Sequence, residues 1–145
     1  MKGNDIALKL FVVMSRANHA ITDAIKLDIK SHGLNPTEFA VLELLYHKGD
    51  VPLQKIGEKI LLASGSITYV VDKLEGKGYL QRLSCPKDRR ITYAVITEQG
   101  KQLMDEIFPK HEAKIAELFS VFSEDEQVQL ISAFKKLGYH AEEKK

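Results

Sequence analysis

Hydrophobic residues recur along this chain at the three- and four-residue spacing of helices that pack one face inward. Residues 5–32 carry such a stripe, and this predicts one long helix. Further apolar side chains widen the stripe beyond the one face that a small chain needs for its own packing. A partner subunit is therefore expected to cover part of this helix. The additional apolar positions are Ile6, Leu8, Phe11, Val12, Ala20 and Ile25.

A second helix has a clear start signal. Asn35 is a favourable N-cap, Pro36 suits the first helical position, and Glu38 completes a capping box. This helix is expected to end at Gly49. A short third helix is predicted over residues 53–60.

A fourth helix is predicted to begin at Ser64 or Ser66, after a tight turn. Two short helices joined in this way are typical of a helix-turn-helix. Its apolar residues lie at i, i+3, i+4 and i+7, which places them on one helical face that must point to the core: Ile67, Val70, Val71 and Leu74. The other face carries mostly short polar side chains, which suit base edges in a DNA groove, although an ordinary solvated face is the alternative. Those residues are Ser64, Gly65, Ser66, Thr68, Tyr69, Asp72 and Lys73.

The spacing of apolar residues then changes from helical to alternating. Residues 79–84 and 91–96 are predicted to form a two-stranded ribbon with a basic tip, Cys85 to Arg90, in which Pro86 and Asp88 are turn formers. Since two strands alone are marginally stable, the ribbon is expected to lean on the helices.

Helix resumes after Thr97, a predicted N-cap. Pro109 is expected to kink or interrupt this helix. A second capping box, Ser123 to Glu126, predicts the start of the last helix, which has a polar tail from His140.

Composition narrows the class of protein. A chain of 145 residues with 44% hydrophobic and 28% charged residues is expected to fold as one domain. It has no apolar run of membrane-spanning length and no signal-peptide pattern at its start, so a cytoplasmic protein is predicted. The single Cys85 excludes an intrachain disulfide and a cysteine-rich zinc site.

Charge is unevenly distributed. The net charge is +1, yet residues 73–90 hold six bases and two acids, a local charge of +4 that leaves −3 for the remainder. This concentration predicts a phosphate-facing surface on the ribbon and the preceding helix, with a solvated charged loop as the alternative.

Two motifs resemble the MarR family (multiple antibiotic resistance regulators) of bacterial winged-helix repressors. They are Leu74-Glu-Gly-Lys-Gly78 and Asp88-Arg-Arg-Ile-Thr-Tyr-Ala-Val-Ile-Thr-Glu-Gln-Gly100. The resemblance covers almost the whole chain. It implies a mainly α fold with a small β wing, in which residues 34–99 form a winged helix-turn-helix lobe and residues 1–33 and 100–145 form dimerisation helices.

The resemblance also implies residue roles. The fourth helix would read double-stranded DNA through Ser64, Gly65, Ser66, Thr68, Tyr69 and Lys73. In the wing, Arg90 would enter the minor groove with Asp88 orienting its guanidinium, although Asp88 also has the simpler role of a turn former. Arg89 and Lys87 would bind phosphates, and which arginine enters the groove stays open. The family is homodimeric, which implies a palindromic operator.

The regulating signal is less well indicated. Members of the family release DNA when a small phenolic or other aromatic ligand binds, or when a thiol is oxidised. The first helix has no cysteine here, so the peroxide-sensing arrangement does not carry over. Cys85 lies beside four bases and is a candidate redox sensor, with an incidental thiol as the alternative. Phe39 and Tyr46 suit a ligand pocket or plain core packing.

No cofactor or metal site is predicted, because the five histidines are scattered and are interpreted as surface residues. No phosphate loop or nucleophile elbow indicates an enzyme. The predicted function is a DNA-binding transcriptional regulator, a repressor released by an aromatic ligand or by an oxidant or electrophile. The alternative is a winged-helix protein-interaction module that does not bind DNA.

Overall fold

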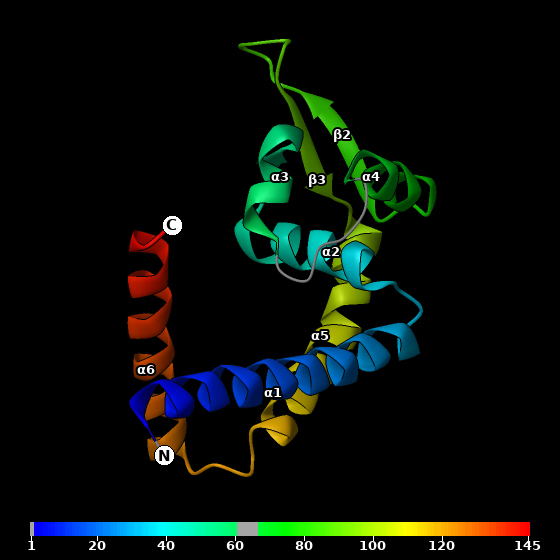
Figure 1. Ribbon diagram of the computed structural model, residues 1–145. Helices are drawn as coiled ribbons and strands as arrows, with labels where there is room; N and C mark the ends of the chain where they lie inside the picture. The colour runs from blue at the N-terminus through cyan, green and yellow to red at the C-terminus, as the bar shows by residue number, and fades with distance from the viewer. Residues whose placement is uncertain (1, 61–66) are drawn as a thin grey trace. The chain divides into compact units, whose positions relative to one another are not determined.

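The computed structural model describes residues 2–60 and 67–145 (Figure 1). Its contacts divide the chain into two compact units, one ending at His111 and the other beginning at Glu112. The part of the chain described contains six helices and one three-stranded antiparallel sheet. The mainly α architecture with a small β wing is as predicted.

The first two helices follow their sequence signals. Helix α1 spans Gly3–Ser31, within two residues of the prediction, and α2 spans Pro36–Lys48. The predicted capping box at α2 is present, since the Asn35 side chain accepts from the Glu38 N–H at 2.8 Å and the Glu38 carboxylate accepts from the Asn35 N–H at 2.9 Å. Seven residues of α2 are buried, so this helix forms the centre of the first unit.

The wing has one strand more than predicted. Strands β2 (Leu80–Ser84) and β3 (Thr92–Ile96) form the expected antiparallel pair, and β1 (Val51–Pro52) adds to the other edge of β3. The two-residue β1 pairs Val51 with Ala94 and Pro52 with Tyr93. The prediction of a two-stranded ribbon was therefore incomplete. Pro52 fits because the strand lies at an edge, where a missing N–H is tolerated.

Two short helices complete the helix-turn-helix. Helix α3 spans Leu53–Lys59, and α4 is described over Ile67–Gly76. The predicted inward residues of α4 are confirmed: Val70, Val71 and Leu74 are buried and Ile67 packs against the same core. That core also includes Leu42, Leu45, Ile56, Leu80 and Met104, so helices and sheet share one apolar centre.

The junction between β3 and α5 (Glu98–Leu118) is closely packed. Thr97 caps α5 as predicted, accepting the Gly100 N–H at 3.1 Å, and its hydroxyl donates to the Gly78 carbonyl at 2.6 Å. Gly100 is buried against the Tyr79 carbonyl, where a side chain would not fit. The prediction that Pro109 could interrupt this helix was wrong, since α5 continues through it to Leu118.

The second unit contains the end of α5 and helix α6 (Glu124–Glu143). Its predicted capping box is present between Ser123 and Glu126. Gln127 donates to the carbonyls of Phe119 and Phe122, which closes the turn before α6. None of the helices described is both long enough and apolar enough to span a membrane.

Candidate nucleic-acid interface

Helix α4 has one buried face and one polar face. The polar face exposes Thr68, Tyr69, Asp72 and Lys73, four of the residues assigned to it from the spacing. Tyr69 is 66% exposed, which leaves most of an aromatic side chain at the surface of a helix whose other face is core. The predicted contacts Ser64, Gly65 and Ser66 lie outside the described residues.

The loop between β2 and β3, residues 85–91 (the wing loop), extends beyond α3 and α4 (Figure 1). Two backbone hydrogen bonds shape it. Cys85 donates to the Ile91 carbonyl at 2.9 Å, and Ile91 donates to the Asp88 carbonyl at 3.0 Å. Lys87 and Arg89 are exposed on this loop, so both cations are available to a polyanion.

Asp88 pairs with Arg90. Its carboxylate accepts from Arg90 Nε and from the Arg90 backbone N–H at 3.0 Å each, and from Nη2 at 3.1 Å. The hydrogen bond from the Arg90 side chain, followed by that from its backbone, lowers the pKa of Asp88. The Arg90 side chain is nevertheless 90% exposed. Between the two adjacent arginines, it is therefore Arg90 whose guanidinium is oriented while fully presented to solvent.

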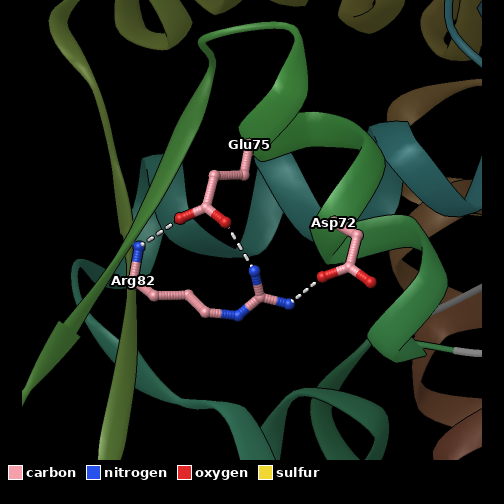
Figure 2. A network of polar contacts seen from close by, with 3 residues as sticks. All are labelled: Asp72, Glu75 and Arg82. Atoms are coloured by element: carbon pink, nitrogen blue, oxygen red, sulfur yellow. Dashed lines mark hydrogen bonds and ion pairs between the residues drawn. The ribbon is translucent and has the colours of Figure 1, made fainter.

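Besides Arg90, two more of the six bases in residues 73–90 are paired with acids of the protein. Arg82 contacts Asp72 and Glu75 on α4, as Figure 2 shows. Lys77 contacts Glu38 of α2 at 2.7 Å. The local charge of +4 therefore overstated the phosphate-facing charge, since Asp72 and Glu38 both lie outside the sequence window that holds these bases.

The Lys77–Glu38 pair is an internal brace of the lobe. Glu38 is 2% exposed and Lys77 is 35% exposed. Burial opposes ionisation of Glu38, but the Asn35 N–H and the Lys77 ammonium outweigh it and lower the pKa of Glu38. The same carboxylate thus caps α2 and holds the chain just after α4.

Aromatic and polar side chains gather where α2 faces α5. The rings of Phe39 and His111 are 4.6 Å apart, as are those of His47 and Phe108, and Tyr46 stacks edge-on against Phe108 at 6.1 Å. The candidate ligand-lining residues Phe39 and Tyr46 therefore belong to one aromatic cluster.

The interpretation of the histidines as dispersed surface residues was wrong for two of them. His32 Nε2 and His111 Nδ1 lie 3.7 and 3.6 Å from the carboxylate of Asp28, and all three side chains are largely buried. Helix packing brings together residues far apart in sequence, which spacing along the chain does not reveal. Across residues 2–60 and 67–145, no group of three His, Cys, Asp or Glu side chains is arranged to hold a metal ion.

Large apolar side chains are exposed on α1. Six of them lie in its first half and are 44–65% exposed: Ile6, Leu8, Leu10, Phe11, Val12 and Val13. In the second unit, α6 exposes Val128, Ile131, Phe134 and Leu137 by 44% or more. Exposure of so many large apolar side chains on one helix is typical of a protein–protein interface.

Comparison with known proteins identifies the chain. Residues 34–92 match the sequence model of the MarR family. The chain is 59% identical over 137 residues to the HTH-type transcriptional regulator MhqR of Bacillus subtilis, and the match covers 94% of each chain. The chain belongs to the MarR family of transcriptional regulators.

Solved MarR structures share its fold. AbsC of Streptomyces coelicolor superposes with a TM-score of 0.83 at 19% identity, over 98% of this chain and 97% of its own. Sco3205 of the same organism, solved in complex with DNA, gives a TM-score of 0.80 at 16% identity, over 90% of this chain and 84% of its own. The winged helix-turn-helix expected from the two motifs is thus the fold of this MarR protein.

Proposed function

We propose that this MarR regulator binds a palindromic operator in the cytoplasm as a homodimer and represses transcription, and that it is not an enzyme. In each subunit α4 enters the major groove and the wing loop reaches the adjacent minor groove. The observation that carries the proposal is the Asp88–Arg90 pair on the wing loop, which fixes a planar cation in an exposed position. Because its orientation is set before binding, Arg90 loses little conformational freedom when it enters a groove.

Contacts divide between bases and phosphates in this proposal. Ser64, Gly65, Ser66, Thr68, Tyr69 and Lys73 face bases or the adjoining backbone, while Lys87 and Arg89 bind phosphates. The exposed polar face of α4 supports the first group, and the exposure of both wing cations supports the second.

Dimerisation is supported by the apolar surface. Residues 1–33 and 100–145 are proposed as the dimerisation helices, because both α1 and α6 expose rows of large apolar side chains. A two-fold dimer places its two α4 helices in successive major grooves, so the operator half-sites are about 10 base pairs apart, centre to centre.

The proposed signal is either a small phenolic or aromatic ligand, or an oxidant or electrophile. The aromatic cluster of Phe39, Tyr46 and Phe108 supports a ligand, because flat apolar rings favour flat apolar partners. The partly exposed Cys85 at the base of the wing loop supports the thiol route. A thermal-shift screen of phenols and quinones on the wild type and on Cys85→Ser distinguishes the two routes. Only a response through the thiol is lost in Cys85→Ser.

DNA binding is tested by fluorescence anisotropy with labelled promoter fragments from the protein's own gene and its neighbours, titrated at several salt concentrations. We expect sequence-selective binding whose affinity falls steeply with salt, by a slope of about 0.9 for each phosphate contact. Absence of selective binding to every fragment would favour a protein-interaction module that does not bind DNA.

Arg90→Ala is the sharpest variant for this test. It should lower affinity about tenfold or more, the loss of one groove contact, while the dimer stays folded. Lys145→Ala removes an exposed cation two residues beyond the end of α6 and serves as the control with unchanged affinity. If Arg90→Ala binds like the wild type, Arg90 does not belong to the interface.

A further inference from the structure

Arg82 of β2 makes three hydrogen bonds to α4. Its Nη2 donates to Asp72 Oδ1, its Nη1 to Glu75 Oε1 at 2.5 Å, and its backbone N–H to Glu75 Oε2 at 3.1 Å. Figure 2 shows the guanidinium between the two carboxylates. One strand residue thus holds two positions of α4 that lie three residues apart.

The three side chains of this network differ in their exposure to solvent. Arg82 is 27% exposed, whereas Asp72 and Glu75 are 60% and 40% exposed. The hydrogen bond to Asp72 is the main cause that raises the pKa of Arg82. Arg82 is thus the least exposed of the three side chains, and its guanidinium faces the two carboxylates of α4. Arg89, by contrast, is exposed to solvent and available to a phosphate.

The network joins α4 to the strand that leads into the wing loop. Arg82 lies two residues before the end of β2 at Ser84. Val71 and Leu74 of α4 and Leu80 of β2 share the apolar core. Apolar packing holds the helix against the strand, but because it is non-directional it does not fix the angle between them. The planar guanidinium of an arginine does fix this angle, because it donates to two acceptors at once in a rigid geometry.

We propose that Arg82 is a positioning residue for DNA binding, which holds α4 and the wing loop at the separation at which both engage one operator half-site. This inference rests on the proposed function. Exposed ion pairs contribute little to folding, so removal of Arg82 changes DNA binding more than stability.

A double-mutant cycle between Arg82→Gln and Arg90→Ala tests the inference, with operator affinity measured by anisotropy. Arg90→Ala costs about tenfold or more in the wild-type background and less than about threefold in the Arg82→Gln background. The reason is that a wing loop no longer held beside α4 gains little from its own arginine.

Three further variants make the cycle decisive. Arg82→Lys keeps the charge but not the fork, and it restores only part of the interaction between the two sites. Glu75→Gln repeats the cycle from the α4 side and replaces Arg82→Gln if that variant melts early. Glu117→Gln breaks an exposed pair with Lys114 on α5 and is the control with unchanged affinity.

Two results overturn the inference. One is an equal cost of Arg90→Ala in both backgrounds, which means that Arg82 does not place the wing loop. The other is full recovery of affinity and of the interaction between the two sites in Arg82→Lys, which means that the charge of Arg82 is sufficient and its fork is not needed. Absence of operator binding by the wild type overturns the proposed function instead, so the two failures are distinguishable.

Discussion

Gly100→Ala is predicted to destabilise the protein strongly, although it adds a single methyl group. A Cβ at Gly100 would lie 2.3 Å from the Tyr79 carbonyl oxygen and 2.8 Å from Ile96 Cγ1. Carbon atoms are at their best separation at about 3.5–4.0 Å, so α5 has to move away from the strands by about 1 Å. The Tyr79 carbonyl is not free to yield, because it accepts the Thr97 N–H at 3.1 Å.

The size of the effect follows from these contacts. Overpacking of this kind costs about 1–3 kcal/mol. The shift also strains two hydrogen bonds of the Thr97 side chain, to Gly78 and from Gly100, each worth about 1 kcal/mol. The expected loss is about 3–5 kcal/mol in the free energy of unfolding, and the melting temperature falls by roughly 10–20 °C.

Urea unfolding followed by circular dichroism measures this loss, with all variants at one protein concentration because a dimer's stability depends on it. Gly57→Ala is the matched control. Gly57 is exposed in α3, and a Cβ there meets only Ile67 Cγ1 at 3.8 Å, an ordinary contact. Alanine should be neutral or stabilising there by up to about 1 kcal/mol. A Gly100→Ala protein within about 0.5 kcal/mol of the wild type would refute the packing argument.

Three further predictions concern pH, the thiol and the dimer. Because the pKa of Glu38 is lowered on folding, its contribution to stability is complete above about pH 4.3 and is lost as the pH falls through the folded pKa. Glu38→Gln should therefore flatten the acid side of a profile of urea midpoint against pH. An unchanged profile would show that Glu38 does not cause the loss of stability in acid. Cys85→Ser should bind the operator normally and, if the signal is an electrophile, should no longer be released by it; release equal to the wild type would exclude the thiol route. Phe11→Glu places a charge on the exposed apolar face of α1 and should shift the protein from dimer to monomer in analytical ultracentrifugation; a stable dimer would move the interface away from this residue.

Short-range signals were sufficient to predict most of the fold. The capping box of Asn35 and Glu38 acts over three residues, so sequence alone locates the start of α2. Strand β1 was missed because a two-residue strand that contains Pro52 has no alternating pattern to detect. It is recognisable only through its partner β3, more than forty residues away in the sequence.

In the candidate site, too, contacts between residues close in sequence were predictable and contacts between distant elements were not. The contact between Asp88 and Arg90 spans two residues and was anticipated from the motif. The pairing of Arg82 with Asp72 was not, because it depends on the angle between a helix and a strand. A carboxylate on the expected DNA-facing side of α4 was the available clue, since such a charge is unfavourable there without a cation beside it.

Both helices of the helix-turn-helix are anchored to the same sheet. Pro52 is at once the last residue of β1 and the N-cap of α3, so α3 grows directly out of the sheet. Helix α4 is attached to β2 at the opposite edge through Arg82. In the proposed complex, the length of an operator half-site is consequently set by the single chain, while the spacing between half-sites is set by the dimer. If α1 and α6 form the dimer interface as proposed, substitutions there are expected to alter operator spacing without altering which bases each half-site contains.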